Sequence, residues 1–218
     1  MNEDRSTQPR AVVDRLVEAH GRTYAADAGI RLRDTPGRLY QLLVLSELAS
    51  TRIRAEIAVD AARVLFAAGL RDPHRMLDAD WQQRVDALGE GGYRRYDEST
   101  ATRLGDGARL LLDRWQGDLR HLHREAGDDV AALAGALQEF PGIGPAGADI
   151  FLREVQGVWS AVAPYFGAKA LQGAERLGLP TDPRELARLT AGHDPAAFAA
   201  ALVRVALHKD AAAQVLGN

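Results

Sequence analysis

The chain has 218 residues, of which 46% are hydrophobic and 26% are charged, and its formal net charge is -3. These values are ordinary for a globular protein that is large enough to bury a core of its own. A slightly acidic chain lacks a general attraction to nucleic acid, so DNA binding would have to come from local geometry such as helix N-termini. The absence of cysteine excludes disulfides, thiolate zinc sites and cysteine-ligated iron–sulfur clusters.

The chain starts with MNEDRSTQPR, a polar segment of mixed charge. No apolar segment of the signal-peptide type follows it, and no apolar run reaches membrane-spanning length. We therefore expect a cytoplasmic protein that does not enter a membrane, and we expect it to be a monomer.

Helical periodicity runs through nearly the whole chain and strand-like alternation is missing, which predicts an all-α protein. A first amphipathic helix contains Val12 to Val17, and a helix that is apolar almost all round begins at Thr35-Pro36. A long helix follows the glycine-rich turn GEGGYRRYDE and reaches about Trp115. The other expected helices span about 50–68, 81–88, 129–140, 145–155, 168–177, a few residues after 183, and 194–207.

The segment PGIGP, residues 141–145, places two glycines and two prolines between two helical stretches. Glycine permits backbone angles that other residues avoid and allows close approach of the main chain to a partner. The free N–H groups at the start of the second helix, with the positive end of its dipole, suit a phosphate oxygen without any Lys or Arg. The alternative is a tight αα-hairpin that only reverses the chain.

The sequence around this segment resembles the helix-hairpin-helix motif of the endonuclease III superfamily of DNA glycosylases. The stretch LQEFPGIGPAGADIFL carries the resemblance, and LYQLLVLSELASTRIRAEIAVDAARVLF, LGEGGYRRYDESTATRL and ERLGLP add weaker similarity in the family's order. The resemblance covers about residues 39–180. The positions that match the motif are Leu137, Phe140, Pro141, Gly142, Ile143, Gly144 and Ala148.

The resemblance implies two helical lobes, one barrel-like and one that joins both termini, with double-stranded, damaged DNA held across the cleft. We expect residues 1–28 to begin the terminal-segment lobe, 29–135 to form the barrel-like lobe, and 136–218 to form the hairpin and C-terminal lobe. We expect no iron–sulfur cluster and no other cofactor, although the hairpin could hold a monovalent cation.

The chain departs from the family's pattern at both catalytic positions. Where bifunctional members carry a lysine that attacks the sugar, this sequence has Ala146, so strand cleavage by that mechanism is not expected. Where members carry an aspartate that stabilises the cationic sugar or positions water, this sequence has Gly167. No residue from Val155 to Ala174 is acidic, so a shifted alignment does not restore the aspartate.

Other carboxylates could act as substitutes, and among them Glu154 and the pair Asp97-Glu98 stay open, although surface carboxylates are usually only solvated. Asp149 lies one helical turn after Ala146 on the same face and is the first candidate catalytic residue, with an ordinary salt bridge to Arg153 as the alternative. Glu47 invites comparison with the catalytic glutamate of adenine-removing members. In those members the glutamate precedes a Gln-Gln-Thr motif. When the threonine of that motif is aligned with Thr51, the position equivalent to the glutamate is Leu45, so Glu47 is discounted.

The turn before the long helix is the expected place for a wedge that fills the gap left by a flipped base, with Tyr93 and Arg94 as candidates. Lys169, two residues after the Gly167 position, is expected to bind phosphate, with a role as an unusual reactive amine as the alternative. His121 and His123 would point apart on a helix, so no metal site is expected. The predicted DNA-binding residues are therefore Pro141, Gly142, Ile143, Gly144, Pro145, Ala146, Tyr93, Arg94 and Lys169.

The first hypothesis for function is a DNA-binding protein of base-excision-repair type, acting as a monofunctional glycosylase on alkylated or otherwise damaged bases. A base that is already cationic needs least help to leave. The second hypothesis is a catalytically inactive protein that binds DNA lesions or structures, and the missing chemistry at Ala146 and Gly167 favours it. The third, favoured by the acidic net charge, is an all-α interaction protein with no nucleic-acid role.

Overall fold

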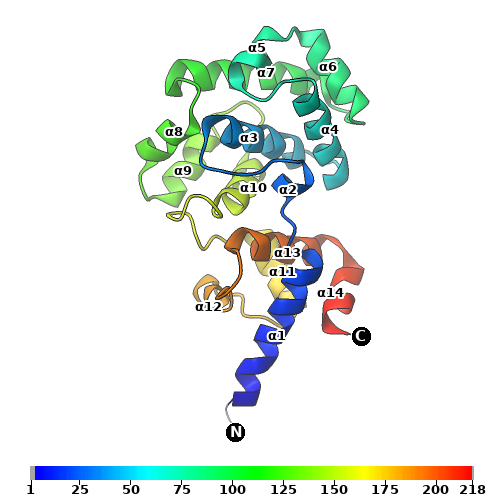
Figure 1. Ribbon diagram of the computed structural model, residues 1–218, viewed down its shortest axis with the longest axis vertical. Helices are drawn as coiled ribbons and strands as arrows, with labels where there is room; N and C mark the ends of the chain where they lie inside the picture. Colours follow the sequence, from blue (N-terminus) through cyan, green and yellow to red (C-terminus); the bar gives the residue numbers. More distant parts are fainter. Residues whose placement is uncertain (1–2, 218) are drawn as a thin grey trace. The chain divides into compact units, whose positions relative to one another are not determined.

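The computed structural model describes residues 3–217, with side chains from Pro9 onward except that of Lys209, and within this range it is helical without a strand (Figure 1). The expected all-α class is confirmed. The helices are α1 Glu3–His20, α2 Tyr24–Asp27, α3 Pro36–Ser50, α4 Ala55–Ala67, α5 Pro73–Asp78, α6 Trp81–Glu90, α7 Asp97–Trp115, α8 Leu119–Ala126, α9 Val130–Leu137, α10 Pro145–Val155, α11 Ala168–Arg176, α12 Pro183–Arg188, α13 Pro195–Leu207 and α14 Lys209–Leu216.

Several helices begin where local signals predicted them. Proline occupies the first turn of α3 and α13, and the Asp194 side chain caps α13 by accepting a hydrogen bond from the amide of Ala196. Thr35 precedes α3 in extended geometry, but its side chain makes no capping hydrogen bond. The short helices α2, α5, α8 and α14 were not predicted, because their length leaves little periodicity to detect.

The described chain divides into two compact units, of which the larger comprises residues 25–152. Helix α3 forms its centre: ten consecutive residues from Leu39 to Leu48 are buried, and Figure 1 shows the other helices of this unit around it. A helix that is apolar on every side is stable only when it is covered on every side. The other helices of this unit therefore pack around α3.

Within the described chain the smaller unit comprises residues 3–24 and 153–217, so the N-terminal and C-terminal segments fold together. Its centre is α13, which packs against α11 and α1. Gly173 of α11 lies so close to α13 that an added Cβ would stand 1.9 Å from the carbonyl oxygen of Leu202. Only glycine permits this approach of two helix backbones.

The boundary between the units differs from the sequence-based division. We expected residues 136–152, which contain the hairpin, to belong with the C-terminal segment, whereas they group with residues 25–135. The reason is packing: the Phe140 ring stacks on Trp115 with centroids 5.4 Å apart, and Ser50 of α3 donates a hydrogen bond to the carbonyl of Gly142. The hairpin is thus built into the larger unit.

Candidate nucleic-acid interface

The 141–145 hairpin reverses the chain between α9 and α10 through a single left-handed residue. Gly142 has φ +87°, a conformation that side chains rarely adopt. Two backbone hydrogen bonds close the turn. The amide of Ile143 donates to the carbonyl oxygen of Phe140, and the amide of Ala148 donates to that of Gly144, each with an N···O distance of 3.0 Å. Ile143 itself is buried and anchors the turn.

The outer side of the hairpin is open to solvent. Gly142, Pro145 and Ala146 are exposed, and Gly144 is half-buried. Within the described range, no protein group accepts a hydrogen bond from the amides of Gly142, Gly144, Ala146 or Gly147. Pro145 has no N–H to offer. Gly147 is buried, so three of these N–H groups, those of Gly142, Gly144 and Ala146, belong to residues on the open side. With the N-terminus of an eleven-residue helix, they form a concentrated donor surface for an anion.

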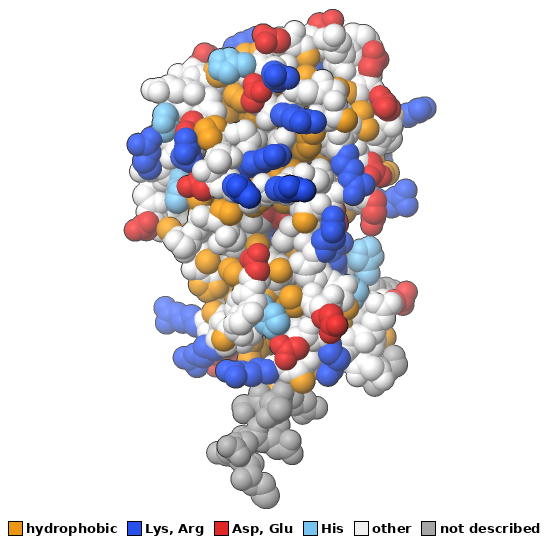
Figure 2. All heavy atoms as spheres, viewed as in Figure 1, with side chains coloured by type: hydrophobic (Ala, Val, Ile, Leu, Met, Phe, Trp, Pro, Cys, Tyr) orange, Lys and Arg blue, Asp and Glu red, His pale blue; other side chains and the backbone are white. Residues whose placement is uncertain are grey.

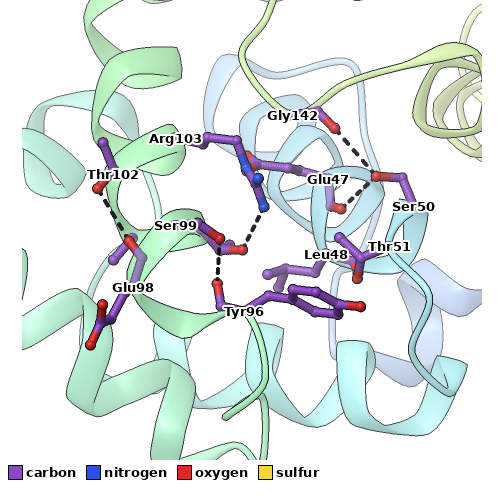
Figure 3. Close-up of polar contacts among 12 residues, drawn as sticks. Glu47, Leu48, Ser50, Thr51, Tyr96, Glu98, Ser99, Thr102, Arg103 and Gly142 are labelled. Carbon is purple, nitrogen blue, oxygen red and sulfur yellow. Dashed lines mark hydrogen bonds and ion pairs between the residues drawn. The ribbon is translucent and has the colours of Figure 1, made fainter.

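The inner side of the hairpin rests on a polar cluster that joins α3 to α7 (Figure 3). The Ser50 hydroxyl lies 2.8 Å from the carbonyl oxygen of Glu47 and 3.3 Å from that of Gly142. Arg103 donates from Nε to Oε1 of Glu47, 3.3 Å, and from Nη2 to the hydroxyl of Thr100, 2.8 Å. These contacts fix the position of the hairpin relative to the two helices beneath it.

Glu47 is the deepest member of this cluster, and its side chain is only 7% exposed. Burial raises the pKa of Glu47 to about 8, against the opposing effect of the Arg103 guanidinium. A Cβ on Gly142 would lie 2.7 Å from Oε1 of Glu47 and 2.9 Å from Nε of Arg103. The position therefore needs glycine both for its backbone angle and for the space that Glu47 and Arg103 occupy.

Sequence reasoning discounted Glu47 as a catalytic group and did not consider Ser50 or Arg103. The structure places Glu47 beneath the hairpin, where it supports the turn. Nothing local in the sequence signals this, because Glu47 and Arg103 are 56 residues apart. The pairing depends on how α7 packs on α3.

The predicted wedge residues at the turn before α7 lie in different surroundings. Tyr93 is fully buried, and its hydroxyl lies 2.6 Å from the Thr51 hydroxyl and 3.1 Å from the carbonyl of Leu48. We therefore correct its assignment, since a side chain held inside the core offers no surface to DNA. Arg94 is exposed, and it remains the predicted contact at this turn.

The predicted catalytic candidate Asp149 is half-buried on α10, three residues after the exposed Ala146. Its role stays a prediction. Lys169 and Gly167 belong to the smaller unit, where Gly167 precedes α11 and the exposed Lys169 donates from Nζ to Gln172, 3.0 Å. Lys169 also lines a surface depression of about 480 Å³, and its contact with phosphate stays a prediction.

Two features are absent from the residues that the structure describes. These residues contain no group of three or more His, Asp or Glu side chains arranged to hold a metal ion, and His121 and His123 both lie on α8. None of the described helices combines the length and apolar character required to cross a bilayer. A monovalent cation at the hairpin stays a prediction.

Comparison with known proteins finds similarity at the level of structure. No protein-family model matches the chain, and no curated protein sequence matches it. Two solved complexes of endonuclease III with DNA, one a trapped covalent intermediate and one non-covalent, each align over 91% of this chain and 84% of theirs, with 17% identity and TM-score 0.50. A thermostable thymine-DNA glycosylase aligns over 92% of this chain and 87% of its own, with 16% identity and TM-score 0.54.

The chain has the helix-hairpin-helix DNA glycosylase fold. The resemblance drawn from the hairpin sequence is thereby confirmed for the fold, and the match extends well beyond residues 39–180, on which the sequence resemblance rested. This member of the fold has no cysteine and so has no ligands for a cysteine-held iron–sulfur cluster.

Proposed function

We propose that this protein is a DNA-binding repair protein that holds one phosphodiester group of duplex DNA on the 141–145 hairpin. The observation that carries the proposal is the set of unused amides at an open, glycine-cornered turn whose inner side is fixed by Ser50, Glu47 and Arg103. The fold supports it, because solved structures that share this fold include endonuclease III bound to DNA. Main-chain donors also explain how a chain with net charge -3 binds a polyanion.

Two glycines of the hairpin allow a test that separates binding from folding. A Cβ at Gly144 meets nothing within 4 Å, and its φ is not positive, so Gly144→Ala leaves the fold intact while the methyl group stands in the path of the phosphate. Gly135→Ala on α9 is the matched control, since a Cβ there is equally free of neighbours.

The expected result is weaker duplex binding by Gly144→Ala, at least about tenfold, because hydrogen bonds to a charged phosphate contribute roughly 1.5–3 kcal/mol each. Gly135→Ala should bind as the wild type does. Neither variant should lower the unfolding midpoint, and Gly135→Ala should raise it slightly because alanine favours the interior of a helix more than glycine does. Unchanged DNA affinity of Gly144→Ala, with the fold intact, would remove the hairpin from the interface.

For chemistry, we propose monofunctional hydrolysis of the bond between sugar and damaged base, with Asp149 as the carboxylate that assists it. The exposed Ala146 methyl group cannot form a Schiff base, so no strand cleavage should accompany base release. Base release from alkylated, oxidised and deaminated duplexes by the wild type and by Asp149→Asn tests this. Equal rates for the two proteins would remove Asp149 from the mechanism.

The second candidate function is recognition of damaged or distorted DNA without turnover. The absence of catalytic chemistry at Ala146 and at Gly167 favours it. Salt-sensitive binding to lesion-containing duplexes without release of any base would identify this function. Binding to no DNA at all would favour the third hypothesis, an all-α protein that interacts only with other proteins.

A further inference from the structure

A depression of about 370 Å³ lies on the larger unit at the N-terminal end of α3. Four arginines line it: Arg31 precedes α3, Arg38 lies on α3, Arg63 lies on α4, and Arg71 follows α4. No Asp or Glu lines the depression. Figure 2 shows Lys and Arg side chains gathered over α3 and over the segment that crosses it in Figure 1.

The arginines are oriented by the surrounding structure. Arg71 donates from Nε to the carbonyl oxygen of Phe66, 2.5 Å, and Arg38 donates from Nη1 to Oε1 of the buried Gln41, 3.0 Å. Each of these bonds uses one of the five N–H donors of a guanidinium. The remaining donors of both residues stay available to a ligand.

The depression is separate from the hairpin. Arg38 lies near the start of α3, whereas Ser50, which supports the hairpin, is its last residue. Twelve residues of helix separate them, a distance of about 18 Å. Arg38 therefore lies too far from the hairpin to contact the phosphate proposed to bind there.

We propose that this depression is a second anion site, which binds phosphate groups of a polyphosphate ligand or of a DNA backbone. Four like charges around one hollow repel each other, and an anion relieves that repulsion. Guanidinium groups bind phosphate through paired N–H donors. The volume lies within the range of small-ligand pockets, about 300–1,000 Å³.

The chain offers a matched control for Arg63. Arg63 pairs with Asp60 at 3.1 Å and Arg109 pairs with Asp106 at 3.8 Å, each three residues apart on a helix and each arginine more than half exposed. Of these two arginines, Arg63 lines the depression and Arg109 does not. The variants Arg63→Gln and Arg109→Gln therefore change the net charge and a surface ion pair alike.

The test is calorimetric titration of the full chain with inorganic triphosphate. The wild type and Arg109→Gln should bind it alike, and Arg63→Gln should weaken binding about tenfold, the effect of losing a charge-assisted contact. The double variant Arg31→Gln with Arg63→Gln should abolish binding. Gly144→Ala should leave triphosphate binding unchanged, which separates this site from the hairpin.

A second experiment, which rests on the proposed DNA binding, measures duplex affinity at several salt concentrations and identifies the source of the phosphate. If the site holds DNA backbone, the double variant lowers the salt dependence of duplex affinity by about one to two phosphate contacts. If it holds a free polyphosphate, duplex affinity stays unchanged while triphosphate binding is lost. The proposal is overturned if the wild type binds no triphosphate and the salt dependence does not change, or if Arg109→Gln weakens binding as much as Arg63→Gln.

Discussion

Replacement of Glu47 by glutamine should change how the stability of the protein depends on pH. An ordinary glutamate has a pKa of 4.5, and burial raises the pKa of Glu47 to about 8. Between these values the unfolded chain releases a proton that the folded chain retains. The free energy of unfolding of the wild type therefore falls as pH rises through this window, by about 1.4 kcal/mol per pH unit.

Between pH 4.5 and about pH 8, the free energy of unfolding of the wild type falls by roughly 5 kcal/mol in total. It falls no further once the pH exceeds the folded-state pKa of Glu47. Glutamine at position 47 retains an oxygen that can accept from Arg103 Nε and carries no titrating proton. The variant and the wild type should therefore have similar stability near pH 4.5, and the variant should be progressively more stable up to about pH 8.

Urea unfolding of both proteins across this pH range measures the difference directly. Glu90→Gln, at the exposed C-terminal end of α6, is the control and should follow the wild type at every pH. A stability difference between Glu47→Gln and wild type that does not vary with pH, or that shrinks as pH rises, would refute the reasoning.

Three further substitutions test the packing of the hairpin and the turn before α7. Gly142→Ala should lower the free energy of unfolding by about 1–3 kcal/mol, because φ +87° strains alanine and its Cβ meets Glu47; stability equal to that of Gly144→Ala would contradict this. Phe140→Ala should cost about 3–5 kcal/mol through the lost stack on Trp115, and a smaller change in urea unfolding would mean that the site collapses around the cavity. Tyr93→Phe should cost about 1–2 kcal/mol through the lost hydroxyl contacts without weakening duplex binding, and a selective loss of DNA affinity would return Tyr93 to the interface.

The elements predicted correctly are those whose signals are local. The start of α10 at Pro145 and its end at Val155 match the expected 145–155, because proline and glycine specify backbone angles within a few residues. The same local chemistry identified the hairpin as a donor surface. Side-chain preferences at neighbouring positions were enough to recognise both.

The parts that sequence did not reveal depend on contacts between distant segments. Tyr93 lies in a polar, glycine-rich turn that suggested exposure, but its surroundings are decided by Thr51 and Leu48, more than 40 residues earlier. The four arginines of the depression span positions 31 to 71, and each alone is typical of a solvated surface. Their juxtaposition exists only once α3 and α4 have packed.

The open corner of the hairpin has a consequence for how such proteins diverge. The donors that the open corner leaves without a protein acceptor are peptide N–H groups, and nearly every residue type has such a group. Mutation can therefore replace most of the surrounding side chains without removing these donors, provided that Gly142 keeps its conformation. The chain and the solved structures that share its fold agree at only 16–17% of aligned residues, so a feature made of backbone is one that can be compared between them where side chains differ.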